Sequence, residues 1–308
     1  MKDKEIIAWG CSKLLYFYLH HTPNHNIKYI VDSNPKWHGK EWCKIPIKAP
    51  QNIEGYNVVI FTVSSRALQD ILGELQQRGM TLGKDVFLYS DFFWNSFSEK
   101  VKKITGTSAD PHLHAIAKSY YLNSKLNVAT TILGNALFVE LIRCTTGGIS
   151  EVGIFNGANT VFGAQFVEGE RSFDTFDTFE GFPSLSEHDP AKEIGEMKGD
   201  ATFESIRDNL SIFPYVSIHK GAVPETFKDI PERKYGLVFY DCDLYQPALD
   251  TFDYYWEKMI PGGYIFIHDY FAEEGGYVGV KKATVEFFEG EKIHELWETT
   301  GCVIKKPI

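Results

Sequence analysis

Apolar segments and helix-patterned segments alternate along the last two thirds of this 308-residue chain. The apolar segments are short strand candidates, and they stand at 149–153, 172–176, 215–219, 236–241 and 263–268. Strands that follow one another through helical crossovers pair in parallel and carry helices on both faces of the sheet. We therefore predict an α/β fold with a doubly wound, mainly parallel sheet. Two extended runs around Thr300-Gly301 predict an antiparallel hairpin at its edge.

The first 95 residues show a smaller pattern of the same kind. Strand-like segments there alternate with helix-patterned ones, beginning with EIIAW, GCSKLLYFYLHH and NIKYIVDSNP. A chain of this length also exceeds what one hydrophobic core usually organises. We predict three parts, which are a small Rossmann-like domain at 1–95, connecting and N-terminal helices at 96–146, and the main domain at 147–308.

Charge and cysteine usage exclude several classes of function. Residues 1–100 hold 12 Lys and Arg against 10 Asp and Glu, and the remainder holds 19 against 31, so the formal net charge is −10. An acidic chain without a broad basic surface is a poor partner for nucleic acid or an anionic membrane. No apolar run reaches the length of a membrane span, and the five scattered cysteines form no CxxC pair. These features predict a cytoplasmic protein with reduced thiols and no zinc site.

A glycine-containing loop follows the first strand of the main domain. The segment ISEVGIFNGANT places Glu151, Gly153, Asn156 and Gly157 around the end of this strand and the start of a helix. Glycine lets the backbone approach a ligand, and the helix N-terminus offers free N–H donors. A carboxylate such as that of Glu151 can accept hydrogen bonds from an ammonium group. An ordinary strand-to-helix turn is the alternative for this loop taken alone.

An acidic residue, Asp177, ends the next strand, about 20 residues beyond the glycine loop. A carboxylate at this position can hold the hydroxyl groups of a ribose. For Asp177 by itself, a solvated loop carboxylate is the alternative. The loop, Asp177 and the alternating pattern together favour a cofactor site, to which we also assign Gly221 after the third strand.

Paired polar side chains follow the fourth and fifth strands. Asp241 and Asp243 end one strand, and His268 and Asp269 end the other. Because neighbouring strands of such a sheet end at the same edge, these groups could share a site suited to Mg²⁺, or to Mn²⁺ if the imidazole takes part. The alternative is that Asp241 and Asp269 only cap the helices that follow.

Five segments, in order, resemble successive motifs of the macrocin-type family of sugar O-methyltransferases: ISEVGIFNGANT, FDTFEGFP, ATFESIRDNL, DCDLYQPALD and MIPGGYIFIHDY. The resemblance covers about residues 110–308. It implies a class I methyltransferase fold, S-adenosylmethionine as methyl donor and a divalent metal, Mg²⁺ by expectation. By position it implies that Asp241 and Asp269 are metal ligands and that Asp243 is the general base. The family usually has two adjacent aspartates where this chain has His268-Asp269, so the third ligand and the metal stay open.

This chemistry would answer a definite need, because a sugar hydroxyl is too weak an acid to attack a methyl group unaided at neutral pH. A bound metal would activate and orient the hydroxyl, and Asp243 would remove its proton. The long polar segment 182–200 is predicted to form a lid that is disordered without ligand. The aromatic residues Phe182, Tyr245 and Tyr270 could stack on a sugar ring, although core packing is the expected role of each.

Residues 1–95 resemble small Rossmann-like domains fused to enzymes of bacterial surface-polysaccharide pathways, through IIAWGCSKLL and YIVDSNPKWHGKEWCKIPI. The dinucleotide fingerprint is incomplete, because Gly10, Ser12 and Leu15 stand where GxGxxG would have its glycines. Asp32 could still contact a ribose. Nucleotide binding therefore stays open beside a structural, dimerising or substrate-docking role.

Three functions remain after the sequence has been considered. The first is methylation of a sugar hydroxyl on a small-molecule or glycan precursor. The second keeps the methyl transfer but has a catechol-like phenol as acceptor. The third is a nonenzymatic binding module that retains the fold. Assembly into a homo-oligomer stays open.

Overall fold

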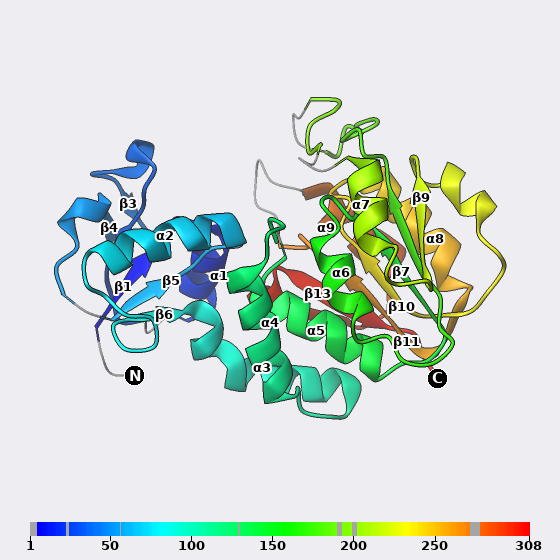
Figure 1. Cartoon of the computed structure of the whole chain (residues 1–308), viewed down its shortest axis with the longest axis horizontal. Helices are drawn as coiled ribbons and strands as arrows, with labels where there is room; N and C mark the ends of the chain where they lie inside the picture. The colour runs from blue at the N-terminus through cyan, green and yellow to red at the C-terminus, as the bar shows by residue number, and fades with distance from the viewer. Residues whose placement is uncertain are drawn as a thin grey trace.

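The computed structural model describes residues 5–22, 25–55, 57–128, 130–189, 193–198, 202–271 and 278–308. Within these residues the chain forms two β-sheets, one from each end of the chain, with helices packed around both (Figure 1). Both sheets are dominated by parallel pairs, so the α/β fold predicted from the alternating pattern is confirmed. In the described part of the chain, no helix has the length and apolar character needed to span a membrane.

The first sheet has the strand order β3-β4-β2-β1-β5-β6. Its strands are β1 (Ile6–Trp9), β2 (Ile27–Val31), β3 (Glu41–Trp42), β4 (Ile45–Lys48), β5 (Val58–Ile60) and β6 (Val86–Leu88). All neighbours pair in parallel except β3 with β4, a short antiparallel pair that the sequence pattern did not indicate. Helices α1 (Lys13–His21) and α2 (Ser65–Gln77) provide crossovers. In Figure 1, α1 lies on the side of this sheet that faces the second one.

The second sheet has the strand order β12-β13-β11-β10-β7-β8-β9. Its strands are β7 (Gly148–Val152), β8 (Phe173–Asp177), β9 (Val216–Lys220), β10 (Tyr235–Tyr240), β11 (Met259–Ile267), β12 (Ile293–Leu296) and β13 (Gly301–Lys305). Strands β7 to β11 are parallel, and β13 is antiparallel to both β11 and β12. The predicted edge hairpin around Thr300-Gly301 is therefore present, and the sheet has the class I methyltransferase arrangement implied by the resemblance.

The order of the second sheet reverses beside β7. From β7 the chain proceeds outward through β8 and β9, and then returns to place β10 on the other side of β7. Every residue of β7 and β10 is buried, because helices cover both faces of the central strands. A reversal of this kind leaves a crevice beyond the carboxyl ends of the strands, where open α/β sheets bind their ligands.

Three helices join the two sheets: α3 (Tyr89–Thr105), α4 (Pro111–Asn123) and α5 (Ile132–Arg143). Helix α3 runs without interruption across residue 95, and the proposed domain boundary there stays a prediction. Helix α5 is buried over nearly its whole length because it packs against the second sheet, with the rings of Phe138 and Phe239 5.2 Å apart. The helices α6 (Ala158–Ala164), α7 (Phe203–Leu210), α8 (Tyr245–Trp256) and α9 (Val278–Phe287) complete the crossovers.

Candidate active site

A pocket opens beyond the carboxyl ends of four strands of the second sheet. The space inside it, together with the open solvent at its mouth, amounts to about 650 Å³. Its walls come from the ends of β7, β8, β9 and β10 and from the segment that follows β8. The carboxylates of Asp177, Asp241 and Asp243 stand there among mostly apolar residues such as Phe155, Val223 and Leu244.

Gly153 brings the end of β7 against the chain that leaves β10. Its φ is +91°, and a Cβ atom built on it would overlap with the backbone carbonyl oxygen of Asp241. The two strand ends are also joined by a 2.8 Å hydrogen bond from the Asp241 N–H to the Val152 carbonyl. Only glycine combines this conformation with so close an approach. Gly153 thus shapes one wall of the pocket, and Gly221, with φ +142°, lines it as well.

Asp177 ends β8, lines the pocket and is held by three backbone N–H groups. Its Oδ2 accepts from Ile154 and Phe155, at 2.9 Å each, and its Oδ1 accepts from Phe179 at 2.7 Å. A carboxylate has about four acceptor positions, so Asp177 keeps capacity for a hydroxyl donor. Burial raises the pKa of Asp177, and the three N–H groups oppose that rise.

Glu151, Asn156 and Gly157 are not among the residues that line this pocket, and their direct contact with a cofactor stays a prediction. Glu151 is 1% exposed, and its two oxygens accept from Asn159 Nδ2 at 2.9 Å and Thr160 Oγ1 at 2.8 Å. Both donors belong to the first turn of α6, so the Glu151 carboxylate anchors that helix. Asn156 is buried, and Gly157 begins α6 in the left-handed conformation.

Glu151 gives a testable pH dependence of stability. Burial raises its pKa to about 8, whereas an unfolded Glu titrates near pH ~4.3. Between these values the folded protein keeps a proton that the unfolded chain has lost, so the free energy of unfolding falls with rising pH by up to about 1.4 kcal/mol per unit. We expect Glu151→Gln to remove this loss and to gain stability relative to the wild type from about pH 5 to pH 8. Urea unfolding of both proteins at pH 5 and pH 8 measures this gain. If the variant and the wild type differed in free energy of unfolding by the same amount at both pH values, the raised pKa of Glu151 would be contradicted.

Four polar side chains predicted to converge are brought together beside the pocket: Asp241, Asp243, His268 and Asp269. Strands β10 and β11 pair in register up to their ends, so the residues that follow each strand lie side by side. Asp243 and Asp269 have φ values of +65° and +51°. Aspartate is one of the few residues that tolerate this left-handed backbone. We call these four residues the acidic centre.

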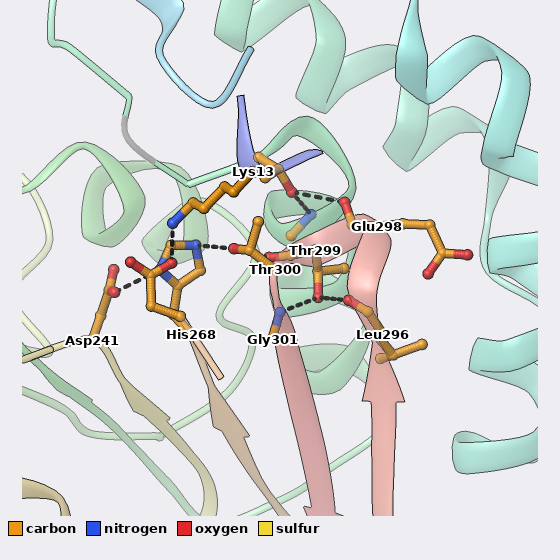
Figure 2. A network of polar contacts seen from close by, with 11 residues as sticks. Lys13, Asp241, His268, Leu296, Glu298, Thr299, Thr300 and Gly301 are labelled. Atoms are coloured by element: carbon orange, nitrogen blue, oxygen red, sulfur yellow. Dashed lines mark hydrogen bonds and ion pairs between the residues drawn. The ribbon is translucent and has the colours of Figure 1, made fainter. Parts of the chain in front are cut away.

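His268 is buried within the acidic centre and uses both ring nitrogens (Figure 2). Its Nδ1 lies 2.7 Å from Asp241 Oδ1 and 3.2 Å from Asp269 Oδ1, as ion pairs whose angles are not those of directed hydrogen bonds. Its Nε2 lies 2.8 Å from Thr300 Oγ1, whose own hydrogen points at the Thr299 carbonyl, so Nε2 is assigned as the donor. Burial alone lowers the pKa of His268, but Asp241 and Asp269 outweigh it and raise that pKa.

Lys13 also reaches the acidic centre, from the first residue of α1. Its Nζ forms an ion pair with Asp269 Oδ1. Burial opposes ionisation of Asp269, but the charges of Lys13 and His268 outweigh it and hold the pKa of Asp269 below its usual value. Burial raises the pKa of Asp243 well above its usual range, and the neighbouring charges of Asp269 and Asp241 add to that rise.

The residues present do not fit the divalent metal that the resemblance implies. Among the described residues, no group of three or more His, Cys, Asp and Glu side chains has an arrangement that could hold a metal ion. The predicted ligands are instead engaged with protein cations, Asp269 with Lys13 and Asp241 with His268. The assignment of Asp241, Asp269 and His268 as ligands of Mg²⁺ or Mn²⁺ is therefore not supported.

The three aromatic residues considered as sugar platforms have different positions. Phe182 lines the pocket, whereas Tyr270 is 2% exposed and packs against Phe271. Tyr245 begins α8, and its hydroxyl donates to Glu286 at 2.6 Å. Of these three aromatic residues, Phe182 therefore remains the candidate for stacking on a sugar ring in this pocket.

Within the predicted lid, residues 190–192 and 199–200 lie outside the described residues. The described part folds back on itself, because the Phe182 N–H donates to the Glu196 carbonyl and the Gly195 N–H to the Phe182 carbonyl, each at 2.9 Å. Met197 in this part lines the pocket. Closure of 182–200 over a ligand stays a prediction.

The loop after β1 is braced by protein groups. Asp32, considered above as a ribose contact, accepts hydrogen bonds from the Cys11 N–H at 2.6 Å and the Asn34 N–H at 2.7 Å. A Cβ atom on Gly10 would overlap with the carbonyl oxygen of Phe61, so this glycine serves close packing between β1 and β5. Nothing in this geometry adds support for nucleotide binding.

Lys13 and Thr300 were not identified from the sequence as site residues. Lys13 pairs with a residue 256 positions away, and a lone lysine at the start of a helix carries no signal of such a pair. Thr300 was noted only as part of a turn. The sequence shows a charged residue, Lys13, in the first turn after the opening strand, but such a position does not indicate which residue it pairs with.

Comparison with known proteins places these features in context. Residues 150–270 match a family model described as a methyltransferase domain. One curated relative is the 8-demethyl-8-(2,3-dimethoxy-α-L-rhamnosyl)-tetracenomycin-C 4′-O-methyltransferase of Streptomyces olivaceus, 24% identical over 166 residues, which are 47% of this chain and 64% of the relative. Another is the mycinamicin III 3″-O-methyltransferase of Micromonospora griseorubida, 23% identical over 168 residues, 46% of this chain and 66% of the relative. The resemblance inferred from the five motifs is thus confirmed.

Solved structures with a similar chain path include the O-methyltransferase NovP, with a TM-score of 0.48 and 16% identity over 70% of this chain and 99% of that chain. The calicheamicin methyltransferase CalS11 has a TM-score of 0.49 and 16% identity, over 68% of this chain and 91% of that chain. The curated relatives are matched over slightly less than two thirds of their own length.

Proposed function

We propose that this chain, which carries a methyltransferase domain at residues 150–270, transfers a methyl group from S-adenosylmethionine to a hydroxyl group of a sugar. One observation carries the proposal: the pocket beside the sheet reversal is bordered by Asp177 on one side and by Asp241 and Asp243 on the other. A cofactor site and a site for proton removal are thereby adjacent. The names of the two curated relatives, both of which methylate sugar hydroxyls, support the choice of acceptor.

The pocket suits S-adenosylmethionine in charge and polarity. This cofactor carries a sulfonium, an ammonium, two ribose hydroxyls and an aromatic base. The carboxylates of Asp177, Asp241 and Asp243 complement its positive charges, and the apolar walls around Phe155 and Val223 suit the base. Asp177 would hold the ribose, because its remaining acceptor capacity matches a hydroxyl donor.

When bound, the cofactor supplies an electrophilic methyl group on a positively charged sulfur. The acceptor oxygen would take up this methyl group, the bonding electron pair would stay on sulfur, and the hydroxyl proton would have to be removed. The chain must take up the hydroxyl proton, and Asp243 is the candidate because its carboxyl group lines the pocket. Asp241 is held in place by His268.

A methyl-transfer assay tests this proposal. Purified chain would be mixed with labelled S-adenosylmethionine and, in separate reactions, a nucleotide-linked deoxysugar, a rhamnoside and a catechol. We expect labelled product with a sugar acceptor and none with the catechol, and calorimetry should show binding of S-adenosylhomocysteine. If only the catechol were methylated, the acceptor would be a phenol and not a sugar. If the cofactor did not bind, the third function, a nonenzymatic binding module, would be favoured. Repeating the assay with a chelator tests the metal dependence that the resemblance implies.

A further inference from the structure

The acidic centre receives a side chain from the opposite end of the chain. Lys13 follows β1 as the first residue of α1, and its ammonium forms an ion pair with Asp269 after the end of β11. Figure 2 shows the Lys13 side chain extending toward His268. The Lys13 side chain is 30% exposed, whereas that of Asp269 is 7% exposed. The contact is therefore made at the mouth of the acidic centre and directed inward.

Helix α1 is packed against the second sheet, so Lys13 is not a free surface arm. The ring of Phe17 lies 5.1 Å from that of Phe271, and Phe17 is only 5% exposed. One turn further along, the ring of His21 lies 5.8 Å from that of Trp297. These contacts fix the helix from which Lys13 projects, so that only the Lys13 side chain itself has to be ordered for its ammonium to reach Asp269.

Asp243 and Asp269 create a need for positive charge at this place. Their residues are 8% and 6% exposed. Asp243 feels the charges of Asp269 and Lys13, and Asp269 feels those of Lys13 and His268. An ionised carboxylate is costly to bury unless it is paired with a cation, bound to a metal or held by hydrogen-bond donors. Lys13 supplies this positive charge from within the chain. Its ammonium pairs with an oxygen of Asp269 that a metal ion would need as a ligand.

We propose that Lys13 takes the place of a divalent metal ion at the acidic centre, as a positioning residue that keeps Asp269 and Asp243 in place for methyl transfer. The inference rests on the proposed function for its catalytic consequence, but the occupation of the centre by Lys13 can be tested without turnover. It also makes the N-terminal part a contributor to the site, because the cation comes from α1.

Binding of Mn²⁺, followed by electron paramagnetic resonance, tests the occupation directly. We expect wild-type protein to bind Mn²⁺ at least 10-fold more weakly than Lys13→Ala, which frees the oxygens of Asp269. Lys28→Ala is the matched control, because Lys28 lies on the same part of the chain in an exposed pair with Glu5. It should behave like the wild type. Equal Mn²⁺ affinity in the wild type and Lys13→Ala would overturn the proposal, whether or not the protein methylates sugars.

Measurements of kcat in the presence of a chelator test the positioning role of Lys13. With excess chelator we expect the wild type to keep its kcat, Lys13→Met to lose at least 10-fold in kcat, and Lys13→Arg to recover part of that loss. S-adenosylhomocysteine affinity and thermal unfolding of the variants identify any general damage to the fold. A wild type that loses activity in chelator and regains it with Mg²⁺ would overturn the proposal, as would a fully active, folded Lys13→Met. Failure of every variant to bind the cofactor would instead refute the proposed function.

Discussion

Replacement of Asp243 by Asn is expected to lower kcat about 10²- to 10⁴-fold, the range that a positioned general base contributes. Asparagine keeps the shape of the side chain but cannot accept the hydroxyl proton. Stability should not fall with activity, because the change removes one negative charge from beside Asp269 and Asp241, and burial already favours a neutral group at this position. The expected result is an inactive enzyme that unfolds at the same or a higher urea concentration.

Steady-state kinetics and urea unfolding of the same preparation check both halves of this prediction. Asp208→Asn is a suitable control, because Asp208 is an exposed residue of α7 paired with Arg207. It should retain wild-type kcat. An Asp243→Asn variant with full activity would remove this residue from the proposed mechanism, and one that fails to fold would mean that its carboxylate has a structural role.

Replacement of Gly153 by Ala should have the largest effect on stability and cofactor binding. The methyl group would overlap with the backbone carbonyl of Asp241, and the left-handed φ of +91° adds strain for any residue with a Cβ atom. Overpacking costs about 1–3 kcal/mol, and the conformation adds about 1–2 kcal/mol. We expect a loss of about 3 kcal/mol in the free energy of unfolding. Cofactor binding should be lost too, because the ends of β7 and β10 must separate.

A second glycine divides these two contributions. Gly79 has a similar φ of +76° just after helix α2, but a Cβ atom there would meet nothing within 4 Å. Gly79→Ala should therefore show only the conformational cost, about 1–2 kcal/mol, with normal cofactor binding. Calorimetric titration with S-adenosylhomocysteine and urea unfolding of both variants provide the comparison. Equal destabilisation of the two would mean that the contact with Asp241 has no effect of its own.

Much of the second sheet could be predicted because its signals are local. Apolar residues mark the strands there between helix-patterned segments, most clearly in β10, and the predicted segments agree with β7 to β10 to within one residue at either end. The hairpin was recognised for the same reason, because Thr300-Gly301 is a local turn signal between two extended runs. In the structure Thr300 adopts the left-handed conformation at this turn. The short β3–β4 pair was missed because Glu41–Trp42 is too short to show an alternating pattern.

The site was predictable only in part. Parallel strands end at a common edge, so the approach of Asp241 to His268 follows from their positions after β10 and β11. The direction of a side chain does not follow from such a pattern. Glu151 ends up facing α6 because Asn159 and Thr160 are there to satisfy its oxygens.

The sequence by itself determined the order of strands and helices, the glycine at the end of β7 and the gathering of acidic residues at one edge of the second sheet. These depend on the local periodicity of apolar residues and on the rule that parallel strands end together. Only the tertiary structure decided which positively charged side chain pairs with these carboxylates. Packing of α1 through Phe17 carries Lys13 to Asp269 across 256 positions, and a contact formed by the packing of distant surfaces leaves no trace in either local sequence.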